Sequence, residues 1–157
     1  MFSAPNAVFS TAMGFEFAET MQGTVEWDAE PGRSYPFKFE VTAHAESVRA
    51  HLRNGKAALH GVVHAPPRAD SADAEGTITI RPLGQKIIRY ELSFPTDDGH
   101  RLELVGQKDI SFLHPFRSFT QLPAELRDER GQRVGTCKTH FDLGRDLWSF
   151  VRSFRPA

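Results

Sequence analysis

The stretch FEFAETMQGTVEW, residues 15–27, alternates apolar and polar side chains along its whole length. The odd-numbered positions include Phe15, Phe17, Met21, Val25 and Trp27, and the even-numbered positions include Glu16, Thr20, Gln22, Thr24 and Glu26. A period of two is typical of a β-strand with one buried face and one solvated face. The stretch therefore predicts a half-buried strand, and much of the remaining chain repeats its pattern.

The segments that follow predict an antiparallel β-domain. Residues 35–43 alternate in the same way, and Pro31-Gly32 before them supplies a turn. Further strands are predicted at 59–63, 76–82, 86–94, 101–109, 118–126 and 132–142, with a hairpin turn at 97–99. Residues 67–75 are small, polar and acidic, and predict a mobile loop. About eight strands joined by successive turns predict a barrel or a sandwich, and the run of hairpins favours the barrel.

Two segments have helical spacing. Val48 and Leu52 lie four residues apart, which predicts a short helix at about residues 45–54. At about residues 143–154 one apolar stripe predicts a C-terminal amphipathic helix, and its members are Leu143, Leu147, Phe150, Val151 and Phe154. We expect this last helix to cover an open end or face of the sheet.

The whole chain has the size and balance of one globular domain. Its 157 residues fit a single domain over 1–157, with residues 1–13 as a flexible N-terminus. The formal net charge of −1 argues against nucleic acid as a partner. No apolar run is long enough to cross a membrane, and no secretory signal opens the chain. A single cysteine cannot form an internal disulfide. The sequence thus predicts a cytoplasmic protein, and its richness in Arg and Ala fits a bacterial source.

The residue types that bind metals or act as nucleophiles form no familiar motif. His60 and His64 share one strand but lie roughly 13 Å apart, because four strand steps separate them. His44 and His51 are two helical turns apart, and neither Cys-x-x-Cys nor His-Glu-x-x-His occurs. Cys137 is predicted to be a small buried hydrophobe. The glycines form no nucleotide-binding fingerprint. No metal or cofactor is therefore predicted.

Glu19 is the carboxylate whose position in the sequence points most clearly to a buried site. It shares the inward parity of Phe17 and Met21, so its side chain is expected to face the interior. A buried carboxylate must pair with a cation or change its pKa. Three residues are candidate partners: Arg89, Arg101 and Lys108. A structural ion pair at the rim is favoured over a catalytic or ligand-binding role.

The aromatic composition points to a dry interior. The chain has 13 Phe but only two Tyr and two Trp. Phe has no polar group, so it belongs in a packed core or an apolar pocket. Small barrels either fill their interior with side chains or hold one ligand. A filled core is the simpler interpretation, and a cavity for a lipid, sterol or aromatic molecule is the alternative.

Several segments resemble a known type of domain. They are FAETMQG (17–23), LHGVV (59–63), RYELSF (89–94), GHRLELVGQK (99–108) and DLWSFVRSF (146–154). Together they resemble the extra β-rich domain that accompanies some cholesterol-oxidase-like flavoproteins of the GMC oxidoreductase superfamily. The chain lacks a flavin-binding fingerprint and is too short to hold the oxidase domain. The resemblance therefore implies an accessory module linked to apolar, lipid- or sterol-like molecules, and not oxidase activity.

These observations predict a non-catalytic binding or accessory module for a small apolar ligand, or for an enzyme that handles one. The residues expected to contact the ligand face inward by alternation or lie where the last helix meets the sheet: Phe17, Glu19, Phe37, Phe39, Tyr90 and Trp148. The alternative is a small enzyme, such as an isomerase or hydrolase, using acid–base chemistry on an apolar substrate. In that alternative the acid–base residue would be Glu19, Tyr90 or His60.

Overall fold

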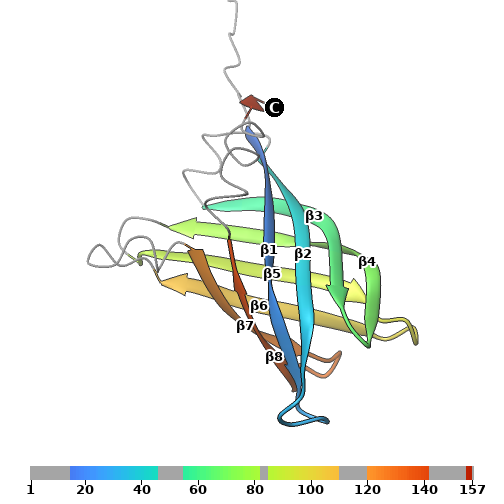
Figure 1. Ribbon diagram of the computed structural model, residues 1–157. Coiled ribbons are helices and arrows are strands. Elements are labelled where there is room, and N and C mark those ends of the chain that lie inside the picture. Colours follow the sequence, from blue (N-terminus) through green and yellow to red (C-terminus); the bar gives the residue numbers. More distant parts are fainter. Residues whose placement is uncertain (1–14, 46–54, 82–84, 110–119, 142–154, 157) are drawn as a thin grey trace, which may run out of the picture.

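The computed structural model describes residues 15–45, 55–81, 85–109, 120–141 and 155–156. Its strands are β1 (Phe15–Trp27), β2 (Ser34–Ala45), β3 (Lys56–Ala65), β4 (Ala69–Arg81), β5 (Ile87–Pro95), β6 (Arg101–Asp109), β7 (Gln121–Arg127), β8 (Arg133–His140) and β9 (Arg155–Pro156). Strands β1 to β8 form a closed antiparallel barrel (Figure 1), and the short β9 pairs with the start of β1. The barrel expected from the run of hairpins is confirmed.

The barrel is a meander that β1 closes. Each strand from β1 to β8 pairs with the next one in the sequence. In β1, Phe15–Glu26 pairs with β2, and Gln22–Trp27 also pairs with β8. The strand with the clearest alternation is therefore the one that joins the two ends of the sheet.

The inward faces of the strands form one core. Alternate residues along each strand are buried, as the period of two requires. The largest fully buried side chains are Trp27, Tyr90, Phe37, Phe39, Phe94, Met21, Ile78, Leu92, Leu104, Leu122, Leu126 and Val25. Most of the charged side chains lie on the outer face, and the main exceptions form the site described below.

The two ends of the barrel differ. At one end, here called the turn end, short connections at 28–33, 66–68, 96–100 and 128–132 join the strands. The hairpin turn predicted at 97–99 is confirmed, with Gly99 at a φ of 88°. The other end, here called the distal end, is where β1, β3, β5 and β7 begin and β2, β4, β6 and β8 finish.

Trp27 closes the barrel near the turn end. Its indole Nε1 donates a hydrogen bond to the carbonyl oxygen of Pro66 over 2.9 Å. The guanidinium of Arg68 lies 4.4 Å from the centroid of the indole ring, within cation–π range. The buried ring is thus held from two sides, and the interior at this end is packed.

The prediction of a mobile loop at 67–75 is wrong. Strand β4 begins at Ala69, and Ala69, Ala72 and Ala74 are buried on its inner face. Ser71 has a positive φ of 50°, and the register with β3 shifts between Val63 and Ala65. This irregularity breaks the alternation near the start of the strand, and small alanines give a weak apolar signal.

The predicted helices fall mainly on residues outside the described ranges. Ala45, the expected start of the first helix, belongs to β2, and residues 46–54 are not described. Residues 143–154 and the N-terminal residues 1–13 also lie outside the described part of the chain. Within the described ranges, no helix is long and apolar enough to span a membrane.

Gly76 marks a place where two strands approach too closely for a side chain. A Cβ atom added to Gly76 on β4 would overlap the backbone carbonyl oxygen of Glu91 on β5. Backbone cannot move aside as the end of a flexible side chain can. We therefore expect Gly76→Ala to lower the free energy of unfolding by about 3 kcal/mol, at the upper end of the usual range for overpacking.

Urea unfolding followed by circular dichroism measures this loss. Glu75→Ala, at the preceding and exposed position of the same strand, is the control, and should change stability by less than about 0.5 kcal/mol. An unchanged midpoint for Gly76→Ala would show that the strands separate easily at this position.

Candidate functional site

Three polar side chains meet inside the barrel. The hydroxyl of Tyr90 donates a hydrogen bond to Glu19 Oε2 over 2.7 Å. Lys108 Nζ donates to Glu19 Oε1 and to Tyr90 Oη, each over 3.1 Å. The exposed fractions are 8% for Glu19, 1% for Tyr90 and 3% for Lys108, so the whole cluster is buried. We call these three residues the interior triad.

The triad spans the barrel. Glu19 lies on β1, whereas Tyr90 and Lys108 lie on β5 and β6, four and five strands further along the meander. Tyr90 is directly opposite Gly106 in the β5–β6 register, which makes Lys108 its diagonal neighbour. Hydrogen bonds across the interior thus join opposite walls of the barrel.

Burial keeps Tyr90 protonated. Loss of water around its hydroxyl raises the pKa of Tyr90 well above the usual value, and the neighbouring carboxylate of Glu19 raises it further. The hydroxyl therefore acts as a hydrogen-bond donor to Glu19 throughout the ordinary pH range. The ammonium of Lys108 also lies 5.1 Å from the centroid of the Tyr90 ring.

The raised pKa of Tyr90 can be tested by alkaline titration, because the chain has only two tyrosines. The pKa of Tyr35 is also raised, by partial burial and a hydrogen bond to Glu30, but less than that of Tyr90. We expect tyrosinate absorbance to report one tyrosine in the folded protein, and the second only as the protein unfolds.

The raised pKa of Tyr90 also fixes the direction in which folding stability changes with pH. Tyr90 has a raised pKa in the folded state, so its contribution is fully present below the unfolded-state pKa of about 10 and is lost as the pH rises above it. Tyr90→Phe is the control, and its folded form should show the same single tyrosine. Two tyrosines ionising together in the folded protein would contradict this assignment.

The exposed fractions vary along the interior. Towards the turn end, beyond the triad, Met21, Phe39 and Leu104 are each 0% exposed. Towards the distal end, Phe17, Ala45 and Ile88 are each 6% exposed. The exposed fraction does not separate the two sides of the triad, because Ala72 on the turn side is 8% exposed and Ala43 and Ile78 on the distal side are each 1% exposed.

The structure brings together some of the residues predicted from the sequence. Glu19 and Tyr90 are bonded, and Phe39 packs against Tyr90 with ring centroids 6.1 Å apart. Phe37 lies one step further towards the turn end, with its ring centroid 6.3 Å from that of Phe39, and is also buried. Phe17 lies on the distal side.

Other predicted residues lie elsewhere. Trp148 is outside the described residues. His60, the third acid–base candidate, is exposed on β3 and does not join the triad. Lys108 is one of the three cations that the sequence offers as partners of Glu19. Its inward parity with Leu102 and Leu104 was the available signal.

Of the three candidate partners of Glu19, the structure selects Lys108. Arg89 pairs instead with Glu91 on the outer face, over 3.4 Å. The side chain of Arg101 donates to Ser93 Oγ, also outside the barrel. The negative charge of Glu19 is therefore neutralised by Lys108 of β6, which lies across the barrel interior from β1.

The remaining reactive residue types form no second centre in the described part of the chain. Cys137 is buried, and desolvation raises the pKa of its thiol to about 12, so it has little thiolate at neutral pH. This agrees with its predicted role as a small hydrophobe. Among the described residues, no group of three His, Cys, Asp or Glu side chains is placed to hold a metal ion.

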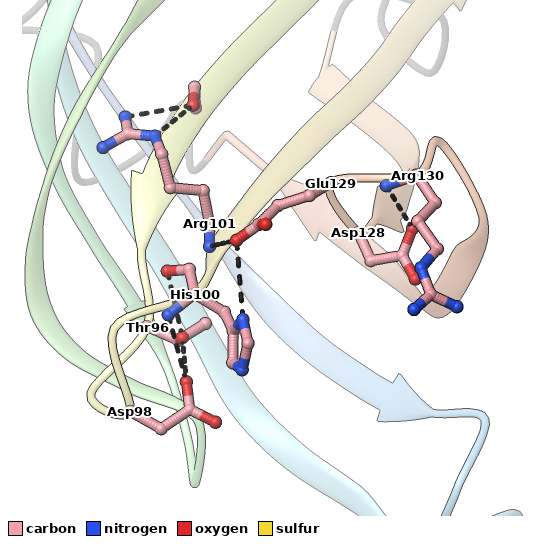
Figure 2. A network of polar contacts seen from close by, with 8 residues as sticks. Thr96, Asp98, His100, Arg101, Asp128, Glu129 and Arg130 are labelled. Atoms are coloured by element: carbon pink, nitrogen blue, oxygen red, sulfur yellow. Dashed lines mark hydrogen bonds and ion pairs between the residues drawn. The ribbon is translucent and has the colours of Figure 1, made fainter.

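A second concave region lies at the turn end. It is an open cleft of about 540 Å³ lined by residues of the turns at 66–68, 96–100 and 128–132. Figure 2 shows its polar network. Asp98 accepts hydrogen bonds from Thr96 Oγ1 and the backbone N–H of His100. These bonds lower the pKa of Asp98.

The second half of this network joins two turns. Glu129 accepts a hydrogen bond from the backbone N–H of Arg101 over 2.8 Å and lies 3.5 Å from His100 Nδ1 (Figure 2). Asp128 accepts from the backbone N–H groups of Arg130 and Gln132, each over 2.9 Å. The acidic groups of the cleft thus hold the turns in shape, which is a structural role.

Comparison with known proteins adds no relationship. No protein-family model matches the sequence, no curated protein matches it, and no solved structure matches the fold significantly.

Proposed function

We propose that the protein is a non-catalytic binding or accessory module, and that the distal part of its barrel interior binds one small apolar molecule. The polar group of that molecule contacts the interior triad, and its apolar body lies among Phe17, Ala45, Ala57 and Ile88. The observation that carries this proposal is the buried Glu19–Tyr90–Lys108 cluster in a mainly apolar interior.

A buried ion pair needs a reason beyond stability. Removing two charges from water costs several kcal/mol per ion, and apolar residues of similar volume often stabilise a core equally well. Binding sites for small molecules, in contrast, are mainly apolar with a few converging polar groups. The triad has that composition, and an eight-stranded barrel is of the size that can hold one small ligand.

Small inward side chains on two neighbouring strands reduce the bulk of the barrel interior. On the inner faces of β3 and β4, five positions are alanine and two are glycine: Ala57, Gly61, Ala65, Ala69, Ala72, Ala74 and Gly76. The alanines leave more of the interior unfilled than Leu or Phe would, and Ala57 is the one of them nearest the distal end.

Native mass spectrometry tests the proposal. Gently purified protein, alone and after incubation with decanol, is compared with the same sample denatured. We expect a mass excess of one small molecule that disappears on denaturation. Ala57→Leu, which fills the distal interior, should weaken decanol binding by about tenfold or more, equivalent to about 1.4 kcal/mol.

The neighbouring residue gives a matched control. Ala58 is exposed on the outer face of the same strand, so Ala58→Leu should leave binding unchanged. Equal binding by both variants would place the ligand outside the barrel. Absence of any bound molecule, including decanol, would overturn the proposal and favour a purely structural triad.

The Glu19–Tyr90 hydrogen bond also supports a second candidate, acid–base catalysis on an apolar substrate. In that case the Glu19 carboxylate would take a proton from the carbon beside a ketone, while Tyr90 and Lys108 hydrogen-bond the developing enolate oxygen. Returning a deuteron from heavy water would then label the ketone. Protein-dependent exchange of decanone that Glu19→Gln abolishes would favour this enzyme, and no exchange would exclude it for such ketones.

A further inference from the structure

We propose that the ligand of the barrel interior is a neutral molecule with a single hydroxyl or keto oxygen, and that the charge balance of the interior triad selects against carboxylates and amines of the same size. This inference rests on the binding function proposed above and adds the chemical class of the ligand.

The first argument is the balance of charge. Among the described residues, the buried ionisable side chains are Glu19, Tyr90, Lys108 and Cys137. Glu19 and Lys108 form an ion pair over 3.1 Å, while burial keeps Tyr90 and Cys137 protonated and uncharged. The interior therefore carries no net charge. A ligand charge placed there would have no opposite charge left to match it, and burying an unmatched charge is very unfavourable.

The second argument is the remaining hydrogen-bonding capacity. An ammonium group has three N–H donors. Lys108 uses two of them on Glu19 and Tyr90, and its third contact is with the thioether of Met21, with Sδ 4.0 Å from Nζ. Thioether sulfur is a weak acceptor. One donor is thus available to an oxygen atom of a ligand.

The carboxylate of Glu19 has complementary capacity. It accepts one hydrogen bond at each oxygen, from Lys108 and from Tyr90. Two carboxylate oxygens offer about four acceptor positions, so further donors can be accommodated. A hydroxyl group can accept from Lys108 and donate to Glu19, and a ketone can accept from Lys108. Neither changes the charge of the interior.

The experiment compares four ligands of equal chain length, namely decanol, decanone, decanoate and decylamine, by isothermal titration calorimetry at neutral pH. Their apolar bodies bury nearly the same area, so differences in affinity report the polar group. We expect decanol and decanone to bind at least about tenfold more tightly than either charged ligand, a difference of about 1.4 kcal/mol or more.

Variants of the triad should reverse the preference. Glu19→Gln leaves the charge of Lys108 unmatched, and should make decanoate the tightest ligand. Lys108→Met leaves the charge of Glu19 unmatched, and should favour decylamine. Tyr90→Phe keeps both charges, and should keep the preference for neutral ligands. This last variant preserves the test if the charge-altering variants do not fold.

The outcomes separate the two proposals. If decanoate or decylamine binds the natural protein as tightly as decanol, the neutral-ligand inference is overturned while the binding function stands. If none of the four ligands binds, the binding function itself fails. A preference for neutral ligands that persists unchanged in Glu19→Gln and Lys108→Met also contradicts the inference, because charge balance would then not be its cause.

Discussion

Replacing Lys108 with methionine is expected to lower the free energy of unfolding by about 3–5 kcal/mol, the usual cost of removing one partner from a buried ion pair. The substitution leaves the carboxylate of Glu19 in the interior with only the hydroxyl of Tyr90 as a polar contact among the described residues. Chemical denaturation at neutral pH measures the loss. Since the stability of a domain of this size is typically about 5–15 kcal/mol, the variant should still be testable in its folded state.

The matched control is Lys138→Met. Lys138 is exposed on the outer face of β8, so the same substitution there should change stability by no more than about 0.5 kcal/mol. A loss of less than about 1 kcal/mol for Lys108→Met would mean that Glu19 finds another partner, or becomes protonated at little cost.

Replacing all three residues of the interior triad tests whether the triad serves the stability of the barrel or the binding of a ligand. In Glu19→Leu/Tyr90→Phe/Lys108→Met, the whole triad becomes apolar, and no buried polar group remains without its partner. We expect this variant to be at least as stable as the natural protein, because apolar replacement of a buried ionic cluster is often neutral or stabilising. It should also lose the preference for ligands with a hydroxyl or keto oxygen. A triple variant as unstable as Lys108→Met would instead show that the triad exists to stabilise the barrel.

The sequence predicts much of this fold because its alternation is regular where the barrel wall is regular. The alternation identifies β1 and β5 nearly to their ends, since large apolar residues occupy most inward positions of β1 and all those of β5. β4 was missed in its first half because its inward residues there are alanines and Ser71 interrupts the pattern. Alternation thus identifies strands through the size of the inward side chains, and fails where these are small.

The site was only partly predictable for a related reason. Alternation places Glu19 in the interior, and it also favours the inward Lys108 over Arg89 and Arg101, whose positions alternate outward. That Lys108 reaches Glu19 follows only once β1 is known to face β5 and β6 across the closed barrel. That arrangement depends on closure and long-range register, which a strand's own sequence does not encode.

Phe39→Ala is expected to lower the free energy of unfolding by about 3–5 kcal/mol, as is usual for removing a buried aromatic ring. Phe39 is 0% exposed, and its ring lies between those of Phe37 and Tyr90, with centroids 6.3 Å and 6.1 Å away. The cavity left behind lies on the turn side of the triad, where β1 and β3 flank β2 and limit collapse.

The control for this prediction is Phe141→Ala, since Phe141 is only partly buried against the same core and should cost less. Urea denaturation of both variants gives the comparison. The same experiment bears on the site, because the Phe39 ring supports Tyr90 on the side away from the distal interior. If that packing holds the hydroxyl in place, Phe39→Ala should also weaken decanol binding, whereas Phe37→Ala, one ring further away, should cost similar stability with less effect on binding. Equal losses of binding in the two variants would show that the ligand senses the stability of the whole core, and not the position of Tyr90.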